Sequence, residues 1–230
     1  MRQLMKTPFV LSLVLCTMAA PVPAVEGSAL ATARLPIRAT VFTDAPDRRN
    51  LSPYDDLVRR YADHYGFDWR LIVALMYQES QFDPEAVSPA GAQGLMQVMP
   101  ETGLAFGFED LHEPEVSIHA GIHYLDQQRN RFEHTLATDA RNWFALAAYH
   151  AGLERVRSAR RRAEAMGLNP DRWFGHVEQA MLEMQQPHTG SKPKGGRHWA
   201  VKTVRYVRAI RGRYDAYRQH FPEQLAALTP

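Results

Sequence analysis

One glutamate, Glu79, ends a strongly apolar helical pattern in this 230-residue sequence. Leu71, Leu75 and Glu79 recur at intervals of four residues behind a predicted N-cap at Asp68, so they share one helix face. A carboxyl group buried in the last turn of a helix loses water and meets partial negative charge, and both effects raise its pKa. Glu79 is therefore a candidate general acid. The alternative is a solvated residue at a fraying helix end.

The residues after Glu79 have the composition of a ligand-binding loop. Gly91 and Gly94 predict a tight turn whose backbone can approach a ligand closely. Gln97 then places an amide among apolar neighbours, which is typical of a pocket wall. A short hairpin is expected at most between residues 87 and 98, since no other stretch alternates at period two.

Four ordered motifs resemble the SLT family of lytic transglycosylases, in glycoside hydrolase family 23. They are ESQFDPEAVSPAGAQGLMQVMPETG from Glu79, which spans two of them, AYHAG from Ala148, and YVRAIR from Tyr206. The stretches YADHYGFDWRLIVALMYQES and WFALAAYHAG are most similar to the membrane-bound F-type members. The resemblance covers residues 54–217. It implies an all-α, goose-type-lysozyme-like domain with a small loop or hairpin region beside the active site.

The resemblance also implies a reaction on peptidoglycan glycan strands. Glu79 would protonate the oxygen that links N-acetylmuramic acid to N-acetylglucosamine. It would then take the proton of the muramoyl C6 hydroxyl, which closes onto C1 as a 1,6-anhydro end. No cofactor and no metal are expected.

The family pattern assigns substrate-binding roles to further residues. Ser88 corresponds to a serine whose hydroxyl reaches the glutamate, and Gln97 to an amide that pairs with an N-acetyl group. Met99 would line the sugar groove. Tyr149 and Tyr206 would bring hydroxyls to the acid. Without the motifs, turn formation or core packing would explain these side chains.

His150 departs from the family pattern, which has asparagine at this position. A neutral imidazole offers one donor and one acceptor, and their places depend on the tautomer. We therefore expect His150 to bind substrate, with a role that differs from that of an amide. This departure is also the one feature that favours a non-catalytic murein-binding scaffold.

A goose-type lysozyme, which is a hydrolase, is the nearest alternative. Hydrolytic glycosidases usually use two carboxylates. The neighbouring candidates are Asp83, which precedes Pro84 in an expected turn, and Glu85, which is expected to be solvated. Neither has a predicted setting comparable to that of Glu79.

The N-terminal residues indicate export to the periplasm, with or without membrane association. Arg2 and Lys6 precede an apolar run, and small residues end at Ala24, which predicts a signal peptide over 1–24. An uncleaved anchor is the alternative. Cys16, the single cysteine, would be lost on processing, which excludes thiol chemistry and disulfides. A flexible tether is expected over 25–51, the SLT domain over 52–220 and a tail over 221–230.

Charge is distributed unevenly along the chain. Residues 1–140 hold 11 Lys and Arg against 18 Asp and Glu, whereas residues 141–230 hold 16 against 7. Because an exported protein rarely meets nucleic acid, the basic half favours the carboxylates of peptidoglycan stem peptides. The expected partners are glycan strands and cell-wall or membrane assemblies, for a monomeric protein. Arg160, Arg161 and Arg162 are expected to form a solvated helix face.

Helix boundaries follow from capping residues and apolar periodicity. Ser52 is expected to cap a first helix that begins at Pro53 and ends at Gly66. The Glu79 helix comes next. Further helices are expected over 114–132, 142–151, 153–166, 170–185 and 198–220.

Overall fold

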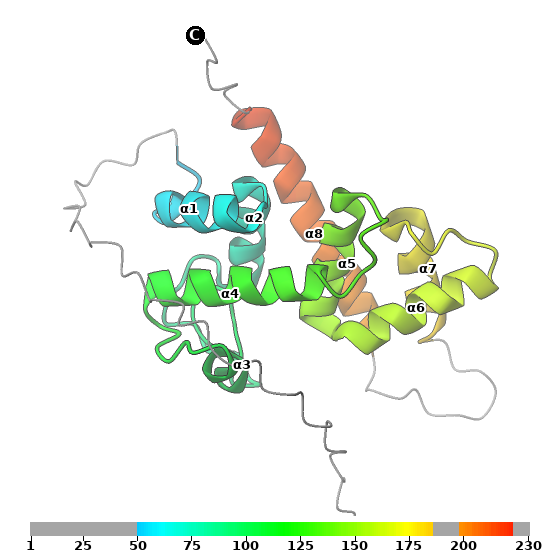
Figure 1. The fold of residues 1–230 in the computed structure, drawn as a ribbon, viewed down its shortest axis with the longest axis horizontal. Helices are drawn as coiled ribbons and strands as arrows, with labels where there is room; N and C mark the ends of the chain where they lie inside the picture. Colours follow the sequence, from blue (N-terminus) through cyan, green and yellow to red (C-terminus); the bar gives the residue numbers. More distant parts are fainter. Residues whose placement is uncertain (1–49, 186–197, 223–230) are drawn as a thin grey trace, which may run out of the picture. The chain divides into compact units, whose positions relative to one another are not determined.

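The structure, a computed structural model, describes residues 50–185 and 198–222. The predicted signal peptide, nearly all of the tether and residues 223–230 lie outside that part. Within it, the regular elements are helices (Figure 1). They are α1 (Asp55–Tyr65), α2 (Trp69–Ser80), α3 (Pro100–Ala105), α4 (Pro114–Arg129), α5 (Thr138–Ala151), α6 (Leu153–Ala165), η1 (Trp173–Val177), α7 (Glu178–Glu183) and α8 (Trp199–His220). The expected all-α class is confirmed.

Two helices organise the packing. Helix α2 lies against α1 and α8, while α5 lies against α4, α6 and α8 (Figure 1). Residues 71–76 of α2 are all buried, because neighbouring helices cover this helix on more than one side. Phe144 of α5 and Trp173 of η1 are among the largest fully buried side chains. Full burial of a side chain such as that of Phe144 stabilises the fold by about 1.5–3 kcal/mol.

The start of α2 is fixed by its predicted cap. The Asp68 carboxylate accepts the amide of Arg70 at 3.0 Å, and the Tyr214 hydroxyl of α8 donates to it at 2.9 Å. Asp68 therefore caps α2 and joins it to α8. Gly66 ends α1 in the left-handed conformation, with φ 67°, as predicted.

The first helix begins two residues later than expected. Ser52 Oγ accepts the Tyr54 amide at 3.2 Å, and the Asp55 carboxylate accepts the Ser52 amide at 2.9 Å. These bonds form a turn ahead of the helix, whose N-cap is Tyr54 and has no side-chain hydrogen bond. The prediction that Ser52 is the N-cap is therefore wrong, because regular helix begins only at Asp55.

The helix expected over 170–185 is wrong as a continuous element. Phe174 is extended and Gly175 is left-handed with φ 77°, so the chain is kinked within η1, ahead of α7. The Glu178 carboxylate accepts the Gly175 amide at 2.7 Å and pairs with Arg208 of α8 at 2.9 Å. Glu178 therefore fixes the start of a new helix, α7. The short α3, which has Pro100 in its first turn, was also not predicted.

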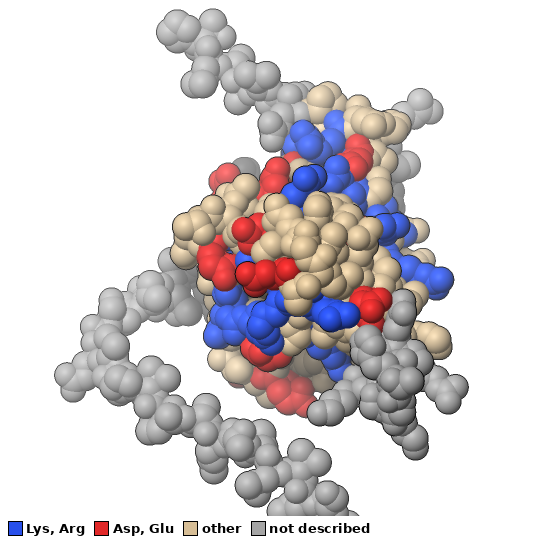
Figure 2. All heavy atoms as spheres, turned by 90° about the vertical axis from the view of Figure 1, so that its right-hand side faces the viewer, with Lys and Arg blue, Asp and Glu red and all other residues tan. Residues whose placement is uncertain are grey.

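The expectation of a solvated Arg160 is wrong. Its guanidinium pairs with Glu133 and Asp171, both at 2.7 Å, and its side chain is only 15% exposed. Figure 2 shows basic and acidic groups side by side on the face where α6 and α7 lie in Figure 1. Much of the positive charge of the second half is therefore neutralised locally. Among the described residues, no helix is long and apolar enough to cross a membrane.

Gly121 of α4 makes room for the loop that follows α2. A Cβ at this position would lie 2.4 Å from the Cβ of Met96, whose carbonyl accepts the Tyr149 hydroxyl. We predict that Gly121→Ala lowers the melting temperature. Overpacking costs about 1–3 kcal/mol, which exceeds the helix propensity gained from alanine.

Gly212 of α8 is the matched control, because a Cβ there meets no atom within 4 Å. Gly212→Ala should raise the free energy of unfolding by about 0.5–1 kcal/mol. Thermal unfolding followed by circular dichroism compares the two variants. An equal response at both positions would contradict the packing proposed for Gly121.

Candidate active site

Glu79 lies in the last turn of α2, where this helix contacts α8. The Tyr206 hydroxyl of α8 donates a hydrogen bond to Glu79 Oε1. Burial raises the pKa of Glu79 to about 7, while the Tyr206 hydrogen bond, which favours the ionised form, lowers it by less. On the predicted helix face, Glu79 thus carries a carboxyl group that holds its proton up to neutral pH.

The two oxygens of this carboxyl group have different surroundings. Oε1 accepts from Tyr206, and among residues 50–185 and 198–222 no hydrogen-bond partner lies on Oε2. Because Tyr206 already donates to Oε1, the acidic proton of Glu79 belongs on Oε2. The proton therefore belongs on the oxygen that has no partner among the described residues.

Tyr149 of α5 lies near the same carboxyl group. Its hydroxyl donates to the Met96 carbonyl at 2.7 Å, and its ring lies 5.0 Å from that of Tyr124. Burial, and then the Glu79 charge, raise the pKa of Tyr149, and the same causes raise that of Tyr206. Both phenols stay neutral beside the acid, and Tyr149 uses its hydrogen to hold the loop backbone.

Several residues near Glu79 have backbone conformations that residues other than glycine rarely adopt. Gln81 and Phe82, directly after α2, have φ of 55° and 71°, and Gln97 has φ 49°. Such residues cost of order 1–3 kcal/mol each and cluster at functional sites. Ser80 supports the turn, since its hydroxyl donates to the Leu95 carbonyl at 2.9 Å and accepts the Phe82 amide at 3.1 Å. No sequence signal distinguishes these non-glycine positions.

Gln97 holds the loop after α2 together. Its amide nitrogen donates to the carbonyls of Ala86 at 2.9 Å and Gly94 at 3.0 Å. Both donors are therefore engaged, and the amide oxygen remains to accept from a ligand. The expected hairpin is reduced to two isolated antiparallel bridges, Val87 with Gln93 and Gln93 with Val98.

Ser88 and Met99 lie in the same loop. Ser88 Oγ accepts the Ala92 amide at 3.0 Å, and within the described part of the chain no hydrogen bond joins it to Glu79. Met99 is 36% exposed just before α3, so its thioether is accessible to a ligand. The family role of each side chain stays a prediction.

His150 packs against the residue that holds the acid. Its ring centroid lies 4.5 Å from that of Tyr206, and its Nδ1 lies 3.1 Å from Thr203 Oγ1. The sequence predicts that His150 binds substrate, and it gives no partner for the ring within the protein. In the structure, one edge of the imidazole is fixed by α8 and another remains exposed.

The two other acidic residues of the loop are placed as predicted. Asp83 Oδ1 accepts the Glu85 amide at 2.9 Å, which closes a local turn. The Glu85 side chain is 78% exposed and lies 3.8 Å from His112. Neither carboxylate contacts Glu79 within the described residues.

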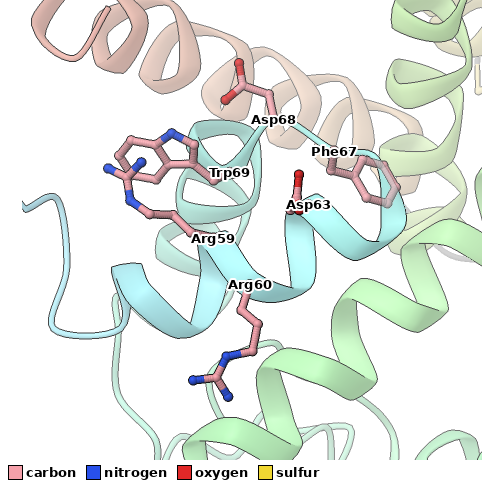
Figure 3. Close-up of a pocket in the computed structure, with 6 residues that line it drawn as sticks. All are labelled: Arg59, Arg60, Asp63, Phe67, Asp68 and Trp69. Carbon is pink, nitrogen blue, oxygen red and sulfur yellow. The ribbon is translucent and has the colours of Figure 1, made fainter. Parts of the chain in front are cut away.

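A separate hollow of about 480 Å³ lies where α1 meets α2 (Figure 3). The Arg59 guanidinium lies over the Trp69 ring, 3.4 Å from its centroid. Asp68 also lines the hollow, and its carboxylate accepts hydrogen bonds from Arg70 and Tyr214. No predicted site residue lines this hollow. Elsewhere in the described part, no group of three or more His, Cys, Asp or Glu side chains could hold a metal ion.

Comparison with known proteins gives the class of this chain. Residues 56–170 match the model of the transglycosylase SLT domain. The membrane-bound lytic murein transglycosylase F of Alcanivorax borkumensis is 38% identical over 162 residues, which are 70% of this chain and 34% of that protein. The chain belongs to the SLT transglycosylase family, and it spans about a third of the length of this curated relative.

Solved structures agree with that assignment. The 70-kDa soluble lytic transglycosylase of Escherichia coli has a TM-score of 0.54 at 27% identity, over 76% of this chain and 25% of that one. A complex of the 70-kDa soluble lytic transglycosylase with bulgecin A gives 0.51 at 29% identity, over 74% of this chain and 24% of that one. The helical domain is therefore similar to a part of much longer proteins.

The raised pKa of Glu79 predicts how stability depends on pH. The unfolded chain releases this proton near 4.5, whereas the folded protein keeps it to about 7. Stability is therefore lost as pH rises through this window. We predict that Glu79→Gln, which cannot ionise, is more stable than wild type at pH 8, by at most about 3 kcal/mol. At pH 4 this advantage should vanish.

Thermal unfolding at the two pH values measures the effect. Glu85→Gln, which changes an exposed glutamate of the following loop, is the matched control. It should unfold like the wild type at both pH values. If Glu79→Gln had the same effect at pH 4 and pH 8, the carboxyl group would not be buried as described.

Proposed function

We propose that this protein is a lytic transglycosylase that cleaves the bond between N-acetylmuramic acid and N-acetylglucosamine in peptidoglycan glycan strands. One observation carries the proposal. Glu79 is a half-buried carboxyl group with a pKa of about 7, with one oxygen held by Tyr206 and the other without a protein partner among described residues. This is the state that a general acid requires before reaction at neutral pH.

Glu79 acts first as acid and then as base. Its Oε2 proton passes to the linking oxygen as the bond from that oxygen to the muramoyl C1 breaks. The resulting carboxylate takes the proton of the muramoyl C6 hydroxyl, whose oxygen bonds to C1. Glu79 ends protonated and no water is consumed. A pKa of about 7 suits both steps, because the group must release a proton and regain it.

The surroundings of Glu79 support a lyase rather than a goose-type hydrolase. A hydrolase of the usual kind needs a second carboxylate as nucleophile or as base for water. Asp83 closes its own turn and Glu85 is exposed, so neither supplies this group in the described structure. The muramoyl C6 hydroxyl removes the need for one.

The loop after α2 supplies substrate contacts in this proposal. The Gln97 amide oxygen accepts the N–H of an acetamido group, since its nitrogen is already used within the loop. Met99 offers apolar contact to a sugar ring. Ser88 keeps its hydroxyl hydrogen to donate to a substrate group, because its Oγ only accepts from Ala92.

The place of action follows from the predicted signal peptide and from the membrane-bound relatives. We propose export to the periplasm with membrane association, where glycan strands are available. A monomer is sufficient, because every proposed site residue comes from one chain.

The products of purified murein distinguish the candidate reactions. Digestion in water enriched in heavy oxygen should give 1,6-anhydromuramoyl ends without the label, because the closing oxygen comes from the substrate. Mass spectrometry of the muropeptides reads both features. Labelled reducing ends would contradict the lyase and favour the goose-type hydrolase.

The Glu79→Gln variant tests the acid directly. We predict that it lowers the rate of cleavage by about 10²–10⁴-fold, because both proton transfers lose their group. Binding of murein in a pull-down should be preserved. A wild type that binds murein and never cleaves it would indicate a non-catalytic scaffold instead.

A further inference from the structure

Two histidines of α4 form a cluster with two tyrosines of α1. These helices lie against each other (Figure 1). The Tyr65 hydroxyl lies 3.1 Å from His119 Nε2 and 3.1 Å from His123 Nδ1. The Tyr61 ring stacks on the His119 ring, with the two centroids 4.4 Å apart. We call these four residues the histidine–tyrosine cluster. None of them is a predicted site residue.

Aromatic rings of the segment after α3 cover the two imidazoles. The Phe108 ring meets the His119 ring edge to face, with centroids 4.8 Å apart, and the Phe106 ring meets the His123 ring in the same way at 4.9 Å. All of these side chains are partly buried. Burial disfavours the charged form of an imidazole, because it removes the water that would solvate the charge.

The hydrogen bonds of the cluster are complete when both histidines are neutral. The Gln127 amide nitrogen lies 3.1 Å from His123 Nε2, and because an amide nitrogen only donates, Nε2 accepts. Neutral His123 therefore carries its hydrogen on Nδ1 and donates it to the Tyr65 oxygen. Tyr65 in turn donates its own hydrogen to His119 Nε2.

A proton on either histidine removes one acceptor from this series. Protonated His119 would turn an N–H toward Tyr65, whose hydrogen then loses this acceptor. Protonated His123 would turn an N–H toward the donating nitrogen of Gln127. Acid therefore sets donors against donors at the contact between α1 and α4.

The carboxylates near the cluster already have partners. The charged and titratable groups that face it come from α1, from α4 and from the residue before α4: Arg60, His64, Glu113, Glu115, Asp126 and Arg129. Glu115 accepts from Tyr61 at 2.8 Å and from Arg60 at 3.1 Å. Asp126 pairs with Arg129, and Glu113 accepts the Val116 amide at 2.7 Å.

The surroundings of His119 determine how acid acts on stability. Burial is the largest cause that lowers its pKa from the ordinary value of 6.5; His123 and His64 lower it further, and Glu115 raises it by less. The unfolded chain takes up this proton near pH 6.5, whereas the folded protein takes it up only at lower pH. The stability that the neutral ring contributes is therefore lost as pH falls below 6.5.

The other side of α4 supports the loop after α2. The buried Ser117 Oγ accepts the Met96 amide at 3.3 Å, and Gly121 leaves room for the Met96 side chain. The Tyr124 ring lies 5.0 Å from that of Tyr149, whose hydroxyl donates to the Met96 carbonyl. Helix α4 thus holds the residue that precedes Gln97.

We propose that the histidine–tyrosine cluster is an acid-sensitive contact between α1 and α4, and that protonation of its histidines loosens the support that α4 gives to the active-site loop. With 3.6 residues per turn, residues 119 and 123 lie on the opposite side of α4 from residues 117, 121 and 124. One helix of 16 residues therefore joins the cluster to the loop. The proposal rests on the proposed function only where it concerns cleavage, which becomes slower below pH 6.5.

The test replaces the imidazoles by amides, which form hydrogen bonds and take up no proton in this pH range. The amide variant is His119→Gln with His123→Asn, since these amide groups reach the places of Nε2 and Nδ1. His119→Gln alone is a second, milder variant, for which we expect the same effects in smaller size. The control is His134→Gln, which removes an exposed histidine outside the cluster.

Thermal unfolding is measured in the Glu79→Gln background, because Glu79 acts in the opposite direction and loses its contribution as pH rises from 4.5 to about 7. Between pH 7.5 and pH 5.5 we expect the melting temperature of this background to fall by about 2–4 °C more than that of the amide variant. The control should fall as the background does.

Hydrogen exchange of the Met96 amide measures the loop directly. At pH 5.5 this amide should exchange faster in the background than in the amide variant, and at pH 7.5 the two should agree. With Glu79 intact, the wild type should also lose more of its cleavage rate on purified murein between pH 7.5 and pH 5.5 than the amide variant loses.

Three results would overturn the proposal. Equal pH dependence of the melting temperature in the background and the amide variant would show that the cluster does not sense acid. A changed melting temperature with unchanged exchange of the Met96 amide would leave the cluster a local packing contact. A control that behaves like the amide variant would indicate a general effect of charge.

Failure of the proposed function is a separate result. A wild type that cleaves no murein at either pH would refute the lyase. Exchange of the Met96 amide would still decide for or against the cluster, since it requires no cleavage.

Discussion

The contact between Glu79 and Tyr206 is the interaction on which the site depends. It joins the last turn of α2 to the middle of α8, so it forms only when these two helices are packed together. Burial holds the proton on the carboxyl group, and the phenol keeps that proton on the free oxygen by donating to the other one. Asp68 and Tyr214 join the same helices about two turns away, which fixes their register. The contact between Glu79 and Tyr206 therefore both joins two helices and sets the protonation of the acid.

The loop after α2 contains strained backbone that side-chain hydrogen bonds hold in place. Gln81, Phe82 and Gln97 take left-handed conformations that favour glycine. They persist because hydrogen bonds from the side chains of Ser80 and Gln97 hold the turn. Gly121 lets the loop pack closely on α4. The polar side chains that hold the loop use some of their hydrogen-bonding atoms within it. Only the unused atoms, such as the Gln97 amide oxygen, remain for a ligand.

Local signals predicted the helices that carry their own caps. Asp68 and Gly66 behave as their residue types require, and apolar periodicity placed Glu79 on the correct face. The sequence did not predict the break at Gly175. This break depends on Glu178, which accepts the Gly175 amide and forms an ion pair with Arg208 of α8. The partners of Arg160 were missed for the same reason, since they come from loops distant in sequence.

The sequence predicted which residues belong to the candidate site better than it predicted the contacts between them. Motif resemblance named Tyr206 and His150, but only the structure gives the hydrogen bond that leaves Oε2 of Glu79 without a partner among the described residues. The most direct test is a carbon-13 NMR titration of the Glu79 carboxyl group, assigned by the loss of its signal in Glu79→Gln. We expect a midpoint near 7 in the wild type and a higher one in Tyr206→Phe, which lacks the hydrogen bond that favours ionisation. A midpoint near the ordinary value of 4.5, unchanged in Tyr206→Phe, would contradict this expectation.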